Sequence, residues 1–404
     1  MNRVHLPQKK RNLPLNVVKS VDTLWKLFRI CVCRFFYYYL FFEGYYVCAK
    51  VHLMKNSSEK SNLGFWAKLP KPFFALAPMA DVTDAAFRQM IAKYSRAGEV
   101  GGGPDVFWTE FVSADGLCSA GREVLQRDLT FIERERPIVA QIFGAHPEHM
   151  QKAAAIIRGL GFDGIDINMG CPDKSIEKQG AGSAHMKNPK LAQEVIRAVM
   201  AGAGDIPVSV KTRVGYNKEN LDEWLPQILE TKPAAVTIHA RTRKEMSLVP
   251  ARWELVARAV EIAKGSGTLI IGNGDVASLV DGEKKARATG ADGVMLGRAV
   301  FGTPWLFDRT RTTSPTLAEK FEIMIEHTRL FEELFRGDTC PVRGREGSQR
   351  EPSSSGVKSF AIMKKHYKAY VNGFDGAKEL RVRLMEAKNA DEVEVLTRNF
   401  LKAI

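Results

Sequence analysis

Cys171 has the clearest chemical setting of any side chain in this sequence of 404 residues. It follows Asn168–Met169–Gly170 and precedes Pro172, a pattern that predicts a tight turn with the thiol facing a cavity. A single cysteine is more often buried and inert. A thiol held against a carbon atom can instead serve as a general acid. Cys171 is therefore our candidate catalytic residue, and its neighbours must decide between the two interpretations.

Polar and ionisable residues follow most of the apolar runs between residues 73 and 310. Any one of them alone is most simply a turn or helix-cap residue. Together they favour a ligand site, because nearly every run ends in a hydrogen-bond donor or an ionisable group. They are Pro78–Met79–Ala80, Glu110, Gln141, Asn168, Lys211, His239–Ala240–Arg241, Asn273–Gly274–Asp275 and Gly297–Arg298.

Eight short apolar runs alternate with stretches of helical period and would position these residues. The runs are FFALA (73–77), VFWTE (106–110), PIVAQIF (137–143), GIDIN (164–168), PVSVK (207–211), AVTIH (235–239), TLIIG (268–272) and GVMLG (293–297). The helical stretches include His149–Leu160, Pro189–Met200, Trp253–Lys264 and Ala277–Thr289. This alternation predicts an α/β fold, a (β/α)8 TIM barrel, whose active site lies at the carboxyl ends of the strands. An open doubly wound sheet is the structural alternative.

Two features of these strand ends suit an anionic, phosphate-bearing ring. Lys211 would need a negative partner inside the barrel. A reduced flavin carries its negative charge near N1 and the C2 carbonyl, where a lysine can stabilise it. Gln141 can form a hydrogen bond with the polar edge of the same ring. A lysine that extends to solvent is the simpler alternative. Residues 273–275 and 297–298 follow the seventh and eighth strands, where barrels commonly bind phosphate.

The chain divides into three predicted parts. Residues 1–64 form an extension, expected to be disordered or to precede a true start at Met54, and residues 65–310 form the barrel. Residues 311–404 form a small helical domain, with helical period at 316–336 and 357–386 and a flexible loop at 337–356. The aromatic stretch Leu24–Lys50 contains charges that make a membrane anchor the less favoured interpretation.

The charge distribution weakens any argument from net charge. The whole chain carries +13, but residues 1–53 contribute +7 from nine Lys/Arg against two Asp/Glu, which leaves +6 for the rest. The six cysteines show no CxxC pair and no regular spacing, so a disulfide framework or zinc site is not expected. Without a cleavable secretory signal, a reducing cytoplasm is the expected location.

Eight ordered motifs resemble those of the tRNA-dihydrouridine synthases of bacterial type. They are APMADVTDAAFR (77–88), TEFVSADGL (109–117), AQIFG (140–144), DINMGCPDKSIEKQGAGSA (166–184), VKTRVG (210–215), IHARTR (238–243), NGD (273–275) and GRAVFGTPWLF (297–307). The resemblance covers a little over half of the chain, and NMGCP followed by GAGS is its most specific part. His185, after GAGSA, departs from the usual aliphatic residue.

The resemblance implies FMN as cofactor, NADPH as reductant, and reduction of the C5–C6 double bond of uridines in the tRNA D-loop. Hydride would pass from reduced FMN to C6, and Cys171, which matches the family's catalytic cysteine, would protonate C5. The residues that match FMN contacts are Pro78, Met79, Ala80, Gln141, Lys211, His239, Asn273, Gly274, Asp275, Gly297 and Arg298.

The substrate side is predicted less sharply. The uridine must be flipped out of its stack to reach the pocket, so cationic loops at the mouth would meet the neighbouring phosphates. The family's tail carries a K-H-x-x-x-Y pattern, here in a basic band at 358–388 with interleaved aromatic residues. We predict tRNA or uridine contacts for Glu110, Asn168, Lys174, Arg241, Arg243, Lys364, Lys365 and His366.

The expected partner is tRNA, with no metal, no stable membrane association and a monomeric state. Two other functions stay open. One is an FMN barrel dehydrogenase for free pyrimidines, of the dihydroorotate or dihydropyrimidine type, which would need no basic tail. The other is a non-catalytic tRNA-binding module, against which Cys171 and Lys211 count.

Overall fold

The computed structural model describes residues 39–42, 45–48, 63–335 and 358–403. The chain divides into two compact units, Met1–Ser58 and Glu59–Ile404. In the first unit, β1 (Tyr39–Phe42) and β2 (Tyr45–Cys48) pair as an antiparallel hairpin. The remainder of the predicted extension up to residue 62, and all of the predicted flexible loop 337–356, lie outside the described residues. Among the helices of the described residues, none is long and apolar enough to cross a membrane.

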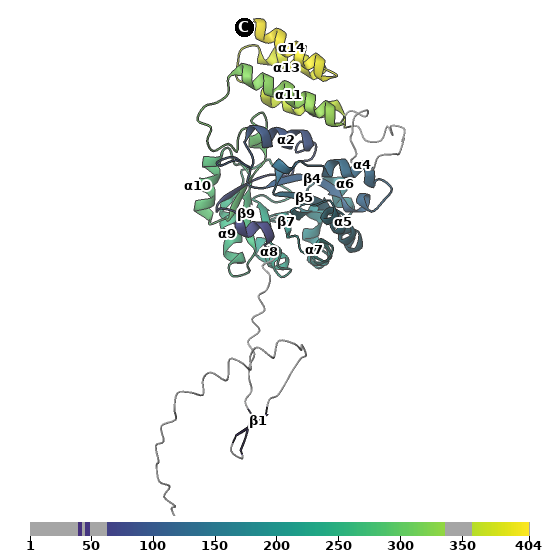
Figure 1. The fold of residues 1–404 in the computed structure, drawn as a ribbon, viewed down its shortest axis with the longest axis vertical. Helices are drawn as coiled ribbons and strands as arrows, with labels where there is room; N and C mark the ends of the chain where they lie inside the picture. Colours follow the sequence, from purple (N-terminus) through teal and green to yellow (C-terminus); the bar gives the residue numbers. More distant parts are fainter. Residues whose placement is uncertain (1–38, 43–44, 49–62, 336–357, 404) are drawn as a thin grey trace, which may run out of the picture. The chain divides into compact units, whose positions relative to one another are not determined.

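The second unit contains the predicted barrel (Figure 1). Eight parallel strands neighbour one another in the order β3-β10-β9-β8-β7-β6-β5-β4, and a parallel bridge from Ala75 to Val106 joins β3 to β4. The (β/α)8 architecture is therefore confirmed. The strands are β3 (Phe73–Leu76), β4 (Phe107–Ser113), β5 (Ile138–Phe143), β6 (Gly164–Met169), β7 (Val208–Arg213), β8 (Ala235–His239), β9 (Leu269–Asn273) and β10 (Gly293–Leu296).

The strands are nearly continuous apolar runs because both of their faces are covered. Every residue of β5, β6 and β9 is buried. Helices that are apolar on one face lie between successive strands and cover the outside of the sheet (Figure 1). They are α2 (Ala85–Tyr94), α5 (Pro147–Gly159), α7 (Pro189–Ala203), α8 (Leu221–Leu229), α9 (Trp253–Ala263) and α10 (Leu279–Thr289). Three shorter helices lie in the same connections: α3 (Ala114–Leu117), α4 (Arg122–Gln126) and α6 (Lys174–Lys178).

Short 3₁₀ helices complete the barrel, and the first of them carries a side chain of the barrel core. They are η1 (Gly64–Lys68), η2 (Arg127–Leu129), η3 (Glu133–Glu135), η4 (Gly182–Lys187) and η5 (Arg298–Val300). Trp66 of η1 is 1% exposed, and its ring centroid lies 5.6 Å from that of Phe73 and 5.7 Å from that of Trp108. Since Trp108 lies on the second strand of the barrel, η1 belongs to the folded barrel.

The tail is helical as predicted, but its described residues contain more helices than the two stretches that the periodicity indicated. Its elements are α11 (Leu317–Phe335), η6 (Phe360–Ile362), α12 (Met363–Tyr370), α13 (Ala377–Glu386) and α14 (Ala390–Ala403). The predicted helical stretch 357–386 divides into η6, α12 and α13, and α14 was not anticipated. Helix α11 packs against both α14 and α2 of the barrel (Figure 1).

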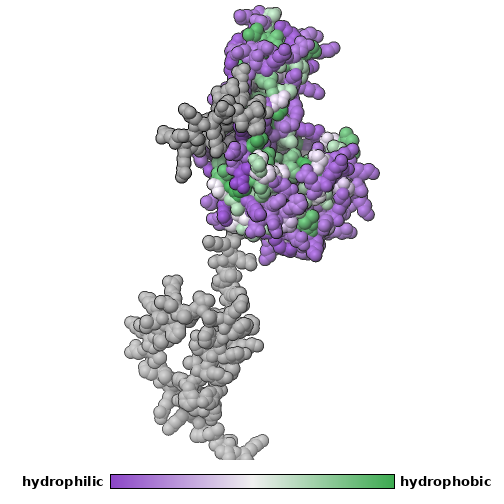
Figure 2. Space-filling view, turned by 90° about the vertical axis from the view of Figure 1, so that its right-hand side faces the viewer, coloured by the Kyte–Doolittle hydropathy of each residue, from purple (hydrophilic) through white to green (hydrophobic). Residues whose placement is uncertain are grey.

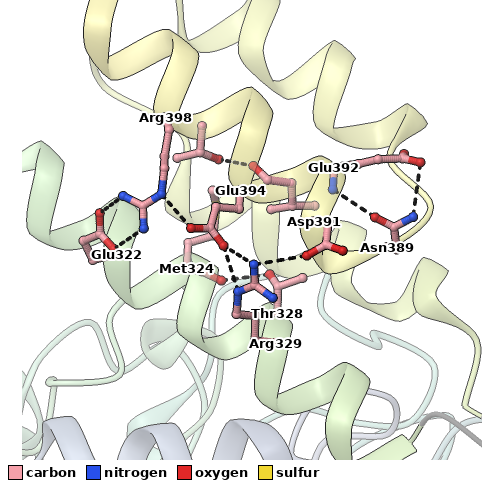
Figure 3. A network of polar contacts seen from close by, with 11 residues as sticks. Glu322, Met324, Thr328, Arg329, Asn389, Asp391, Glu392, Glu394 and Arg398 are labelled. Carbon is pink, nitrogen blue, oxygen red and sulfur yellow. Dashed lines mark hydrogen bonds and ion pairs between the residues drawn. The ribbon is translucent and has the colours of Figure 1, made fainter.

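An exposed network of charges joins α11 to α14 (Figure 3). The Arg329 guanidinium pairs with Glu394, and Arg398 donates from Nε to Glu394 Oε1 at 2.6 Å and from Nη1 to Glu322 Oε1 at 2.8 Å. Exposed pairs of this kind contribute little free energy individually. The buried aromatic residues Phe321 and Phe331 therefore contribute more to the packing of the tail. The surface seen in Figure 2 is mainly hydrophilic, with hydrophobic residues in patches.

Candidate active site

A cavity of about 770 Å³ opens at the carboxyl ends of the barrel strands. Four side chains in its wall are lysine or arginine, namely Lys211, Arg213, Arg241 and Arg298, against one carboxylate, Asp275. This excess of positive charge favours an anionic ligand. Thirteen of the predicted site residues line the cavity: Pro78, Met79, Gln141, Asn168, Cys171, Lys211, His239, Arg241, Asn273, Gly274, Asp275, Gly297 and Arg298.

Asn168 shapes the turn that carries Cys171. Its Oδ1 accepts the backbone N–H groups of Gly170 at 3.1 Å and of Cys171 at 2.9 Å. Its Nδ2 donates to Gln141 Oε1 at 3.0 Å, and Gln141 Nε2 donates to the buried Asp166 at 2.6 Å. The side chains of Asn168 and Gln141 are thus held by each other, and one N–H of the Gln141 amide is left for a ligand.

The surroundings of the Cys171 thiol favour its protonated form. Partial burial raises its pKa and outweighs the hydrogen bond from the Asp173 backbone, which acts in the opposite direction. The following loop is held close, since Ser183 N–H donates to Cys171 O at 3.0 Å. Gly182 makes this approach possible: its φ is +60°, and a Cβ there would lie 2.9 Å from Cys171 O. A protonated thiol beside the cavity is suited to donate a proton.

Lys211 is the cationic group at the base of the cavity. Its Nζ donates to Asn273 Oδ1 at 3.2 Å, and Asn273 Nδ2 donates in turn to Met295 O at 2.8 Å. In the part of the chain that the structure describes, no carboxylate forms an ion pair with Lys211. Burial lowers its pKa to about 8, and the charge of Arg213 adds to this effect. A negative ligand would stabilise this ammonium group.

Arg213 is a site residue that the sequence interpretation missed. It is 7% exposed, and it donates to Gly170 O at 2.8 Å, to Thr242 O at 3.1 Å and to Met246 O at 2.9 Å. The guanidinium therefore joins the loop before Cys171 to the loop after β8. The two-residue period of a strand could have identified it, because Arg213 must point to the same side of β7 as Lys211.

Asp275 organises the wall formed after β8, β9 and β10. It pairs with both Arg241 and Arg298, and it accepts the N–H of Ala251 at 2.8 Å. Burial, with the charge of Lys211 next in size, holds the pKa of His239 well below its usual value, so its ring is neutral. Two guanidinium groups beside one carboxylate leave this wall positive.

Comparison with known proteins identifies the family. The family described as "Dihydrouridine synthase (Dus)" matches residues 75–404. The chain belongs to the dihydrouridine synthase family. It is 38% identical over 340 residues to "Probable tRNA-dihydrouridine synthase 2" of Bacillus subtilis (strain 168), covering 83% of this chain and 96% of that protein. It is 36% identical over 340 residues to "Probable tRNA-dihydrouridine synthase" of Staphylococcus aureus (strain MRSA252), covering 83% and 95%.

Similar solved structures are more distant. Histamine dehydrogenase from Rhizobium sp. 4-9 aligns with a TM-score of 0.43 and 13% identity, over 64% of this chain and 48% of that chain. An old yellow enzyme homologue from Zymomonas mobilis aligns with a TM-score of 0.41 and 14% identity, over 62% and 92%. Scores of this size add nothing to the fold described above.

Glu110 of this dihydrouridine synthase family member lies outside the cavity lining. Strand β4 extends to Ser113, so Glu110 lies within the strand and does not end it. It is 6% exposed, forms an ion pair with Lys358 of the tail, and accepts the N–H of Asp81 at 2.5 Å. Lys358 also lies 3.0 Å from Asp128. Glu110 thus ties the tail to the barrel, and the proposed substrate contact has no support from this geometry.

His366 is placed in the interior, which contradicts the idea that it meets RNA. It is fully buried, with its ring centroid 4.6 Å from that of Phe87, 4.6 Å from that of His327 and 5.6 Å from that of Phe301. Burial lowers its pKa to about 3, so the ring is neutral. The K-H pattern of the tail therefore places lysines at the surface and the histidine in the core.

The remaining predicted residues lie outside the cavity lining. Ala80 and Lys174 are exposed, and Lys365 is exposed with its Nζ 3.2 Å from Asp81. Lys364 is half-buried on α12. Arg243 forms a bidentate ion pair with Glu177, and its guanidinium lies over the Tyr216 ring, 5.1 Å from the ring centroid. Among these five, Lys174, Lys364 and Lys365 stay candidates for phosphate contacts.

Proposed function

We propose that this protein is a flavin-dependent tRNA-dihydrouridine synthase in which Cys171 donates the proton. The single observation that supports this best is the position of the Cys171 thiol on a turn held by Asn168, beside a cavity with Lys211 in its wall. The relatives carry the name "Probable tRNA-dihydrouridine synthase", which indicates the substrate.

The residues present fit FMN. The Lys211 ammonium, which has no acidic partner, would meet the edge of the ring that becomes anionic on reduction. The free N–H of the Gln141 amide would donate to polar atoms of the ring. The positive wall at Arg241 and Arg298 suits the phosphate. Gly274 has a φ of +125°, which favours glycine and brings the backbone close to that wall.

The chemistry divides between cofactor and protein. When bound and reduced by NADPH, FMN would supply the hydride that adds to C6 of the uracil ring. Cys171 then donates its proton to C5, so that the double bond gains one hydride and one proton, and solvent reprotonates the thiolate. The raised pKa of Cys171 favours the neutral, protonated thiol at neutral pH, which is the form that can donate a proton.

The uridine would have to leave its stack to reach this cavity. We propose that Lys174 at the start of α6, and Lys364 and Lys365 on the tail, contact phosphates near the flipped base. We further propose that residues 65–310 act as the catalytic barrel and 311–404 as the tRNA-binding part, and that the protein works as a cytoplasmic monomer.

Replacement of Cys171 tests the proposal. Cys171→Ala should reduce tRNA roughly 100-fold to 10,000-fold more slowly than the parent, the range expected for loss of a general acid. The assay follows dihydrouridine formation in tRNA under single-turnover conditions with pre-reduced protein. Cys118→Ala is the matched control and should keep the parent rate. An equal rate for Cys171→Ala and the parent would refute the assignment.

The two other functions give different results in the same assays. A reductase for free pyrimidines would reduce them in the absence of tRNA, and a non-catalytic binding module would bind tRNA but hold no flavin. The tail favours tRNA over free pyrimidines, since Lys364 and Lys365 have no evident use with a small substrate.

A further inference from the structure

Three potential metal ligands meet outside the cavity. They are Asp115 of α3 and the histidines at positions 146 and 149, at the beginning of α5, and their ligand atoms all lie within 4.8 Å of one another. His149 Nδ1 lies 2.7 Å from Asp115 Oδ1, and His146 Nδ1 lies 3.1 Å from each carboxylate oxygen. None of the three lines the cavity, so the proposed reaction does not account for them.

Local structure brings these side chains together. Ser113 caps α3 by accepting the N–H of Gly116, which places Asp115 in the first turn. His146 is the N-cap residue of α5, and His149 is three residues further on, so both lie on one face of its first turn. Helices α3 and α5 pack together, and Cys118 Sγ donates to His149 O at 3.5 Å.

We propose that Asp115, His146 and His149 form a binding site for a divalent transition-metal ion of the Zn²⁺ type. Two imidazoles and one carboxylate are a common ligand set for zinc, whereas Mg²⁺ and Ca²⁺ prefer oxygen ligands. Bonds of about 2.0–2.2 Å to one ion place its ligand atoms roughly 3–4 Å apart, close to the spacing found here. Water would take the remaining coordination position.

The simpler alternative is an ion pair without a metal. One carboxylate can accept hydrogen bonds from two histidines, and the side chains of His146 and Asp115 are 66% and 32% exposed. Two features favour the metal. Both rings present the same atom, Nδ1, to one point, and the exposure of His146 allows the small adjustment that coordination needs. The site would join α3, which follows the strand of Glu110, to α5.

The test is metal binding by the full chain, prepared without an affinity tag and stripped of metal with a chelator. Zn²⁺ is titrated in competition with a chromophoric chelator, and the melting temperature is recorded with and without Zn²⁺. The parent should bind one more equivalent than His149→Ala or Asp115→Asn, and Zn²⁺ should raise the melting temperature of the parent more than that of either variant.

Glu148→Gln is the matched control, because it lies between the two histidines but outside the ligand set. It should bind Zn²⁺ as the parent does. His149→Gln, which keeps the size of the side chain, serves if His149→Ala does not fold. Equal stoichiometry in the parent and in both Asp115→Asn and the folded His149 variant would overturn the proposal, since the zinc would then be bound elsewhere. All of these variants should form dihydrouridine at the parent rate if the proposed function is correct, so the two proposals fail separately.

Discussion

Two enclosed lysines of this protein have opposite surroundings. Lys211, on strand β7 of the barrel, has the amide oxygen of Asn273 as its hydrogen-bond partner, and burial lowers its pKa to about 8. Lys358, in the tail, lies between Glu110 and Asp128. Burial alone would lower the pKa of Lys358 as well, but the two carboxylates outweigh it and raise the pKa.

The contrast between the two lysines separates a structural role, that of Lys358, from the ligand-binding role that we propose for Lys211. Lys358 is satisfied by groups of its own chain, and it joins parts of the fold that are far apart in sequence. Lys211 is held without an acidic partner at the cavity that we assign to the flavin, so its charge is available to a ligand. An enclosed cation that lacks an acidic partner is therefore the better indication of a binding site, although both are lysines near the same barrel.

The largest effect that the comparison predicts follows removal of Lys358. In Lys358→Met, Glu110 stays buried without its cation, and the free energy of unfolding should fall by about 3 kcal/mol. This is the lower end of the range for buried pairs, because the Lys358 side chain is 17% exposed. Urea denaturation followed by circular dichroism measures it.

Two further variants sharpen this prediction. Adding Glu110→Gln should restore part of the lost stability, because the unpaired charge is then gone. Lys365→Met is the control: its pair with Asp81 is exposed, and the loss should be under about 1 kcal/mol. Equal losses in the two lysine variants would contradict the structural role given to Lys358.

Removal of the Lys211 ammonium should weaken the binding of FMN and leave the stability of the fold unchanged. Lys211→Met would lose the charged hydrogen bond that we propose Lys211 makes to the flavin. Such a bond is worth about 1.5–3 kcal/mol, so the affinity for FMN should fall roughly 10-fold to 150-fold. Flavin fluorescence titration measures the affinity, and Lys364→Met is the control that should bind FMN normally. A large loss of thermal stability without flavin, with FMN affinity unchanged, would reverse the assignment.

The sequence predicted the barrel and most of its cavity for one physical reason. In a parallel barrel the carboxyl ends of all strands meet at one face, so a residue at the end of an apolar run has its position determined by the run itself. Gln141, Lys211 and Asn273 were placed correctly in this way. Arg213 was missed although the same strand period applies to it, because the apolar run ends at Lys211.

Residues that depend on distant partners could not be assigned. Glu110 resembles the other polar strand residues, but its partner Lys358 is 248 positions away and no local pattern indicates the pair. The sequence predicts an RNA contact for His366 as for the lysines beside it, because charge alone does not show which face of α12 packs against Phe87. The role of a side chain with a partner far away in sequence can be assigned only from the structure, whereas the place of a side chain at a strand end can be predicted from the sequence.

The lowered pKa of Lys211 predicts that flavin binding depends on pH. An anionic ligand requires the charged ammonium, and in the free protein this group loses its proton as the pH rises through about 8. The affinity for FMN should therefore be constant below pH 7 and fall by up to about tenfold per pH unit above pH 8. Titrations between pH 6.5 and 9.5 test this, and Lys211→Met should show no such fall. A parent affinity that is constant over this range would mean that Lys211 does not meet the ligand.

The smallest effect concerns ion pairs that are exposed, in contrast to the pair of Lys358. Arg329 pairs with Glu394 and lies 3.1 Å from Asp391 in the network of Figure 3, but its side chain is 49% exposed. Arg329→Met should lower the free energy of unfolding by less than about 1 kcal/mol, because water screens the charges and solvates the partners that are left. Urea denaturation at low salt and at about 1 M salt separates the causes, since a Coulombic loss disappears at high salt and a packing loss does not. A loss as large as that of Lys358→Met would show that the number of charges in a network, and not their burial, sets the stability of the tail.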